Sequence, residues 1–347
     1  MTVSTAPESP APESPVPESP ALAYAAQLPR LLLANLPTPL VEAARLTHAL
    51  GGPPIYVKRD DLAGFGLVGH KARQLEFLVG AALEAGCDVM VTGGGPSSNF
   101  CAAAAAAASA AGLDCHLVLY GAEPEQTHPN LAVAQECGAV VRYTRDPKRS
   151  SVDARVTEVA EALKAGGRRP FAMPRGGATG LGTVGMVLGV QELAAQLDEA
   201  GIDPDMIVIA TGSGGAGAGL ALGASLCGRS WRVVGAAVSR SPEETADQVR
   251  SLAAECAELL GVAPPADRGL ELADARGPGF GVPSHDGESA ARVALRTEGL
   301  VLDPVYTAKA LAVLLRLLDP KSKRPVVFWH TGGLLGAAHH LAGGRSD

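Results

Sequence analysis

Short apolar runs alternate with alanine- and leucine-rich segments along most of the chain, and this alternation constrains the fold more than any other feature. The runs have strand length, and the segments between them, such as 152–165 and 245–260, have helical spacing. Buried strands that alternate with helices predict an α/β fold with parallel sheets covered on both faces. The expected strands lie at 55–57, 89–91, 116–119, 140–143, 171–173, 206–209, 233–236 and 326–329.

The expected organisation is a short tail followed by two α/β domains. Residues 1–20 repeat Pro-Glu-Ser-Pro three times, a composition that favours a disordered acidic segment. Four short βα units within 74–185 are expected to form a small domain. That domain would be inserted into a larger one made of 21–73 and 186–347.

Composition excludes several classes of function. The formal net charge of -7 argues against a nucleic-acid partner. No apolar run reaches the roughly 18 to 20 residues of a membrane span, so we expect no membrane partner. The 6 cysteines show no paired or zinc-like spacing, so we expect no metal and predict buried thiols in a reducing cytoplasm. No apolar stretch typical of a signal peptide follows the N-terminus.

The stretch 64–77 begins with a glycine-rich loop and places one lysine, Lys71, at the start of an expected helix. A cation is poorly placed there, because the helix macrodipole favours anions at its N-terminus. The position makes sense if the amine meets an anionic ligand or acts in its neutral form as a Schiff-base nucleophile. A solvated surface lysine is the alternative. The nearby Arg73 is expected on a solvated face of the same helix.

A second strand-to-helix turn, after the strand at 206–209, has the composition of a phosphate site. Its glycines leave backbone N–H groups free to converge at a helix start. A dinucleotide site is disfavoured, because the next strand ends at 237–239 without an acidic residue for a ribose. A tight structural turn is the other alternative. The expected phosphate-binding residues are Thr211, Gly212, Ser213, Gly214, Gly215, Ala216 and Gly217.

A third turn opens the alanine-rich helix after 89–91. Ser97, Ser98 and Asn99 are either simple helix caps or the binding site of a substrate carboxylate at the helix start. A lysine, a phosphate site and a carboxylate site on three loops are what pyridoxal phosphate and a small amino-acid substrate require together.

Ordered motifs from about residue 30 to 340 resemble the 1-aminocyclopropane-1-carboxylate deaminase / D-cysteine desulfhydrase family. The resemblance implies pyridoxal-phosphate (PLP) fold type II, which is tryptophan synthase β-like, with a small parallel-sheet domain inserted in the large one. It also implies a homodimer. The motifs are Leu36-Pro-Thr-Pro-Leu40, Val57-Lys-Arg-Asp-Asp61, Gly69 to Phe77, Ser98-Asn99, Gly212 to Gly215, Gly277 to Pro283, Arg296 to Gly299, Leu302 to Thr307 and His330 to Gly333.

The resemblance also implies roles for single residues. Lys71 would hold the cofactor as a Schiff base, and Ser98 would be the active-site serine beside the substrate. Asn99 would lie near the cofactor's phenolic oxygen. Thr307 falls opposite the pyridine nitrogen, where the deaminases carry glutamate and the desulfhydrases carry threonine. The neighbouring Tyr306 would line the pocket.

Three further positions are expected to shape substrate binding. Phe100 and Phe280 stand where the family usually carries histidine or glutamine and tyrosine, which predicts a more apolar pocket. His330 would line the pocket, with a packing role as the alternative.

A hydroxyl at 307 makes the cofactor ring a weaker electron sink, which still suffices for β-elimination. The sequence therefore predicts a PLP-dependent lyase that acts on an amino acid by α,β-elimination, as a cysteine desulfhydrase or C–S lyase does, and releases ammonia and a keto acid. Ring opening of aminocyclopropane carboxylate and β-replacement are the alternatives within this chemistry. A catalytically inactive PLP-binding protein is the alternative from another class.

Overall fold

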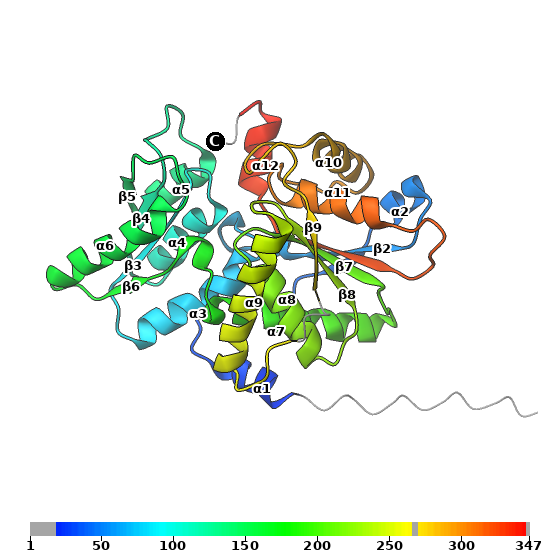
Figure 1. Cartoon of the computed structure of the whole chain (residues 1–347), viewed down its shortest axis with the longest axis horizontal. Helices are drawn as coiled ribbons and strands as arrows, with labels where there is room; N and C mark the ends of the chain where they lie inside the picture. Colours follow the sequence, from blue (N-terminus) through cyan, green and yellow to red (C-terminus); the bar gives the residue numbers. More distant parts are fainter. Residues whose placement is uncertain (1–18, 266–269, 345–347) are drawn as a thin grey trace, which may run out of the picture.

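Two separate sheets of mostly parallel strands form the frame of the molecule (Figure 1). The computed structural model describes residues 19–265 and 270–344. In the larger sheet the strand order is β1-β2-β10-β7-β8-β9, and β1 pairs antiparallel with β2 at its edge. Its strands are β1 (Leu40–Glu42), β2 (Ile55–Arg59), β7 (Met206–Thr211), β8 (Arg232–Ala237), β9 (Leu270–Asp274) and β10 (Val326–His330).

The smaller sheet has the order β5-β4-β3-β6, and its three strand pairs are parallel. Its strands are β3 (Val89–Gly94), β4 (Asp114–Leu119), β5 (Val140–Tyr143) and β6 (Pro170–Ala172). These strands fall inside the segment predicted as the inserted domain, while the exact boundaries of that domain stay a prediction. Of the predicted tail, residues 1–18 lie outside the described residues, and helix α1 (Pro20–Gln27) begins at its last residue.

Every strand expected from the apolar runs is confirmed, and β1 and β9 were not predicted. β1 has three residues, two of them exposed, and so offers no apolar run. β9 carries charged residues at both its second and last positions and is nowhere fully buried. Edge strands that are open to solvent need no continuous apolar sequence.

Helices cover both faces of the larger sheet (Figure 1). Apolar residues of α7 and α8 pack against one face, and those of α2, α10 and α11 pack against the other. α9 lies over α7 and α8, and α12 packs against α5 of the smaller unit. The bounds are α2 (Ala44–Leu50), α7 (Gly180–Ala200), α8 (Gly215–Leu226), α9 (Pro242–Leu259), α10 (His285–Glu298), α11 (Thr307–Leu317) and α12 (Leu334–Leu341).

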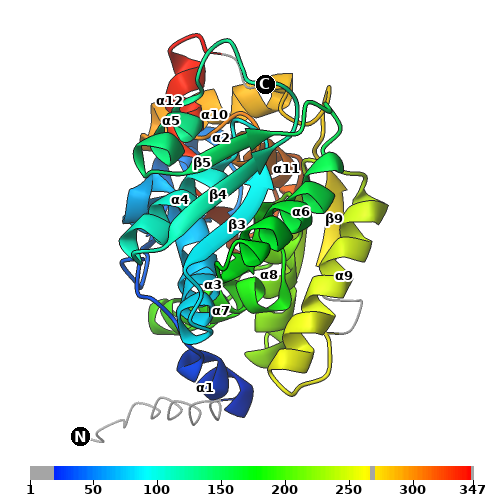
Figure 2. The same ribbon diagram turned by 90° about the vertical axis from the view of Figure 1, so that its left-hand side faces the viewer.

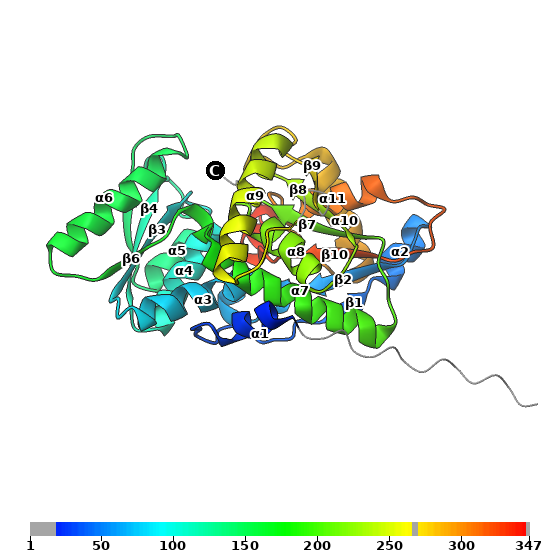
Figure 3. The same cartoon turned by 60° about the horizontal axis from the view of Figure 1, so that its bottom comes forward.

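The smaller sheet is also covered on both faces, as Figure 2 shows from its side. α3 (Lys71–Glu84), α4 (Asn99–Ala110) and α5 (Pro129–Glu136) form one apolar layer, and α6 (Ser151–Ala165) forms the other. The alanines of α4 let this helix lie close to β3 and β4. α3 contacts α4 on one side and α7 on the other, and so joins the two halves of the molecule (Figure 3).

The 6 cysteines are all free thiols, either buried or half-buried. Within 19–265 and 270–344, no helix has both the length and the apolar character that crossing a membrane requires. In the same ranges, no three histidine, cysteine or acidic side chains come together in a way that could hold a metal ion.

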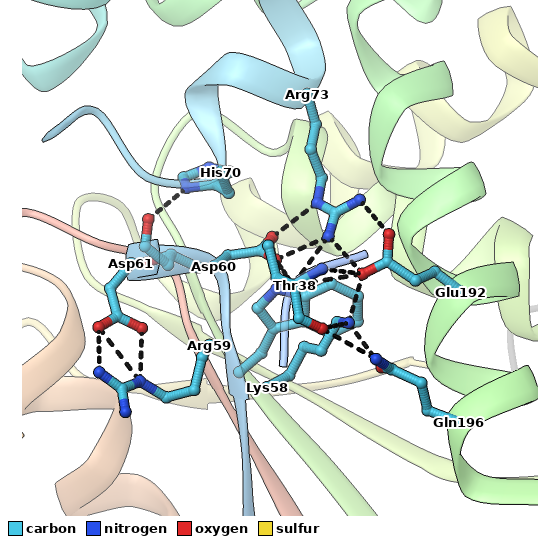
Figure 4. A network of polar contacts seen from close by, with 11 residues as sticks. Thr38, Lys58, Arg59, Asp60, Asp61, His70, Arg73, Glu192 and Gln196 are labelled. Atoms are coloured by element: carbon cyan, nitrogen blue, oxygen red, sulfur yellow. Dashed lines mark hydrogen bonds and ion pairs between the residues drawn. The ribbon is translucent and has the colours of Figure 1, made fainter. Parts of the chain in front are cut away.

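The expected solvated position of Arg73 is wrong, because its side chain lies at the centre of a buried ion network (Figure 4). The guanidinium donates to the Asp60 carboxylate at 2.8 and 3.0 Å and to the Glu192 carboxylate at 2.8 and 3.0 Å. Lys58 is fully buried and pairs with Glu192, while the Thr38 hydroxyl donates to Asp60 at 2.7 Å. Arg73 and Glu192 are 119 positions apart in the sequence, so local patterns could not predict that they pair.

The network joins two cations to two carboxylates and ties β2, α3 and α7 together. Burial is the largest influence and would raise the pKa of Asp60, but the charge of Arg73 and the hydrogen bonds from Arg73, Thr38 and Trp329 together hold that pKa below its usual range. Arg73 lies two residues after Lys71 on the first turn of α3. The network therefore fixes the position from which Lys71 projects.

We expect Arg73→Met to lower the free energy of unfolding by about 3–5 kcal/mol, because it leaves the buried Asp60 carboxylate without its cation. Arg155→Met is the matched control. It removes the same charge from an exposed pair with Glu158 on α6 and is expected to cost less than about 1 kcal/mol. Urea unfolding of both variants checks this. Equal losses in the two variants would contradict a stabilising role for the network.

Candidate active site

A cavity of about 220 Å³ lies at the carboxyl ends of strands from both sheets. Ligands bind at these ends in open α/β sheets. The residues that line it follow β3, β4, β5 and β6 of the smaller sheet and β7, β8, β9 and β10 of the larger one. Of the predicted site residues, those that line the cavity are Lys71, Ser97, Ser98, Asn99, Phe100, Gly212, Ser213, Gly214, Ala216, Phe280 and Tyr306.

Lys71 begins α3, as predicted, and the preceding residues are held tightly against the end of β10. Gly69 has a φ of 62°, and a Cβ atom there would lie 2.1 Å from the carbonyl oxygen of Thr331, so only glycine fits. The backbone N–H of His70 donates to the same oxygen at 3.0 Å. This close approach directs Lys71 into the cavity.

The amine of Lys71 contacts one polar side chain and lies near one aromatic ring. Its Nζ donates to Gln74 Oε1 at 3.3 Å and lies 5.7 Å from the centre of the Phe100 ring. Burial lowers the pKa of this amine from 10.5 to about 8. Gln74 in turn donates to the carbonyl oxygen of Gly176 at 3.0 Å, and no sequence signal had marked it. The surface alternative for Lys71 is therefore wrong.

The start of α4 faces the cavity with Ser97, Ser98 and Asn99. Ser98 is also the helix cap, since its hydroxyl accepts from the Cys101 backbone N–H at 3.2 Å. Asn130, which the sequence did not single out, donates to Asn99 Oδ1 at 2.8 Å and to the Ser97 carbonyl at 2.8 Å. With its oxygen engaged, the Asn99 amide keeps its N–H groups to donate.

The start of α8, the predicted phosphate site, also faces the cavity. Gly214 precedes the helix with a φ of 100°, and a Cβ atom there would lie 2.9 Å from Gln248 Cγ. No side chain caps this helix, so its first backbone N–H groups keep their capacity to donate. Thr211, Gly215 and Gly217 do not line the cavity.

Two further predicted residues, Thr307 and His330, do not line the cavity either. The Thr307 hydroxyl is buried and donates to the Asp303 carboxylate at 2.7 Å. That carboxylate also accepts from the backbone of Tyr306 at 2.8 Å, and so shapes the turn that brings Tyr306 to the cavity. His330 is 1% exposed and contacts the Val301 carbonyl at 3.2 Å, which favours its packing role.

Three arginines, which sequence reasoning missed, also line the cavity: Arg149, Arg175 and Arg240. Each lies in the connection after a different strand, and helical or strand periodicity carries no signal for such positions. The Arg149 guanidinium lies 4.0 Å from the ring centre of Phe280. Phe280 also meets the Tyr306 ring edge-on at 6.2 Å. The pocket is therefore more charged than its two phenylalanines predicted.

Comparison with known proteins identifies the cofactor class. Residues 31–332 match the family model described as pyridoxal-phosphate dependent enzyme. This chain belongs to that family. It is 38% identical over 320 residues to a D-cysteine desulfhydrase of Yersinia enterocolitica, covering 89% of this chain and 94% of that protein. A putative 1-aminocyclopropane-1-carboxylate deaminase of Pyrococcus abyssi is 37% identical over 324 residues, covering 92% and 96%.

Solved structures agree with the fold. A crystal structure of an ACC deaminase homologue superposes with a TM-score of 0.86 at 36% identity, covering 94% of this chain and 98% of that one. Serine racemase from Dictyostelium discoideum shares the fold, with a TM-score of 0.63 at 18% identity over 85% of this chain and 92% of that one. The predicted PLP fold type II, the family resemblance and the cofactor are thereby confirmed.

The residues of the cavity fit pyridoxal phosphate. The uncapped start of α8, with Ser213 and Gly214 on the cavity wall, suits a phosphate. A Cβ atom at Gly212 would lie 2.9 Å from the Tyr306 ring, so a side chain there would crowd the cavity wall. Lys71 is the one lysine that reaches the cavity within the described ranges, and its lowered pKa suits a group that must react as a neutral amine.

We expect capture of added pyridoxal phosphate by the cofactor-free protein to speed up as the pH rises through about 8. Burial favours the neutral amine of Lys71, so the reactive form is scarce below this pH and dominant above it. Stopped-flow absorbance of the cofactor measures the rate. A midpoint near the ordinary lysine value of about 10.4 would contradict the buried amine.

Proposed function

We propose that this protein is a PLP-dependent lyase that removes a β-substituent from a small amino acid and releases ammonia and a keto acid. The observation that carries the proposal is the convergence of Lys71 with the starts of α4 and α8 on one cavity. One helix start suits the substrate carboxylate and the other suits the cofactor phosphate.

Bound pyridoxal phosphate supplies an aldehyde that condenses with amines and a ring that accepts electron density from the substrate's α-carbon. The chain's own residues do the rest. Ser98 and the α4 start hold the substrate carboxylate, and the Lys71 amine, with its pKa near 8, accepts the α-proton at Nζ. Phe100 and Phe280 exclude water from the reacting atoms.

Elimination is favoured over aminocyclopropane ring opening, although relatives named for either activity are similar to this chain. The reason is position 307, where threonine replaces the glutamate that the resemblance expects in deaminases. The Thr307 hydroxyl donates its hydrogen bond to Asp303, and the hydroxyl itself is uncharged. β-Elimination tolerates the weaker electron sink, because the leaving group carries the electrons away.

We also propose that the active form is a cytoplasmic homodimer. The free thiols suit a reducing compartment, and the family resemblance supports a dimer. The domain boundaries at 74 and 185 and the individual site roles belong to the same proposal.

Lys71→Ala is expected to lose the visible absorption of bound cofactor and to lower keto-acid release from β-chloroalanine by roughly 10²–10⁴-fold or more. Lys148→Ala, an exposed lysine in the loop after β5, is the matched control and should keep both. The assay follows ammonia and keto acid with both stereoisomers. A wild-type protein that binds the cofactor but turns over no amino acid would favour the inactive PLP-binding protein instead.

A further inference from the structure

The charges on the cavity wall do not balance. Arg175 is paired with the Asp153 carboxylate at 2.8 Å. The other lining carboxylate, Asp303, is already occupied by hydrogen bonds from the turn that follows it. Within the described ranges, neither Arg149 nor Arg240 lies in ion-pair distance of a carboxylate.

These two arginines are nevertheless held in place. Arg149 donates to the Ser239 carbonyl at 3.4 Å and stacks on Phe280, while Arg240 donates to the Gly212 carbonyl at 3.0 Å. Burial lowers the pKa of Arg240, and the positive charges of Arg149 and Arg175 add to that effect, while the more distant carboxylates of Glu244 and Asp153 only partly offset it. Like charges gathered in a half-buried cavity are costly unless an anion joins them.

The other expected anions do not account for Arg149. The cofactor phosphate is assigned to the start of α8, and the substrate carboxylate is assigned to the start of α4. Arg240 touches the turn before α8 through Gly212, but Arg149 contacts Ser239 and Phe280, which lie outside both sites. Arginine is the side chain best suited to bind a planar or tetrahedral oxyanion through paired N–H groups.

We propose that Arg149, with Arg240 beside it, binds a second oxyanion that the substrate carries on its β-carbon, as a sulfonate or a phosphate ester. The proposal rests on the lyase function above and specifies its substrate. In the reaction the α-proton leaves Cα, and the bond from Cβ to the sulfonate sulfur or the phosphate-ester oxygen breaks with its electron pair going to the leaving group. Water then releases the nitrogen, so that substrate and water give pyruvate, ammonium and sulfite or phosphate.

The test compares the holoenzyme with Arg149→Gln and with Lys148→Gln, which removes the same charge from the exposed neighbouring residue. Substrates are both stereoisomers of cysteate, O-phosphoserine and the uncharged analogue β-chloroalanine, with kcat/KM measured from pyruvate and ammonia. Calorimetry measures binding of 3-sulfopropanoate, which has the second oxyanion but no amine. Titration of the cofactor-free proteins with pyridoxal phosphate gives the cofactor affinity.

We expect Arg149→Gln to lower kcat/KM for cysteate or O-phosphoserine roughly 10- to 100-fold and to weaken 3-sulfopropanoate binding similarly. Turnover of β-chloroalanine and cofactor affinity should stay within about twofold, and Lys148→Gln should behave as wild type. The oxyanion substrate that reacts identifies the sulfonate or the phosphate source.

Equal losses for charged and uncharged substrates, or a loss of cofactor affinity, would overturn the proposal, because Arg149 would then serve the cofactor or the fold. Turnover of β-chloroalanine without turnover of either oxyanion substrate would also overturn it while leaving the lyase function intact. If no substrate reacts, the lyase function fails, and 3-sulfopropanoate binding to wild type but not to Arg149→Gln would still establish the oxyanion site.

Discussion

The ion pair between Arg73 and Asp60 is the interaction on which the active site depends. Both groups are buried, and Glu192 and Lys58 complete a network that joins the last residues of β2 to α3 and α7 (Figure 4). Such a network adds less to stability than an apolar core of the same size, but it is costly to break and admits few arrangements. It therefore sets where α3 begins, and with it where the Lys71 amine projects.

The two proposed anion sites are built in the same way. Each is the start of a helix that follows a parallel strand, so the strand aims the helix's N–H groups at the cavity. Glycines before α8 let the backbone approach the cavity wall, whereas Ser98 before α4 caps the helix with its own hydroxyl. The site thus needs few charged side chains for its core chemistry, and this makes the uncompensated Arg149 and Arg240 informative about the substrate.

The fold and the cofactor could be predicted because they depend on local patterns. Apolar runs mark the buried strands, glycine-rich turns mark the helix starts, and Lys71 stands at one of them. Asn130 and Arg149 could not be found in this way, since they take their places on the cavity wall through contacts distant in the sequence. The solvated position expected for Arg73 failed for the same reason: its carboxylate partners come from β2's end and from α7.

Reduction of the cofactor-bound protein with borohydride, followed by mass spectrometry of its peptides, tests the central claim most directly. The reduction fixes a Schiff base as a stable covalent bond and so marks the lysine that forms it. The account predicts the label on Lys71, whose amine reaches the cavity. A label on Lys58 or Lys309, which are buried and hydrogen-bonded elsewhere, or no label at all, would contradict it.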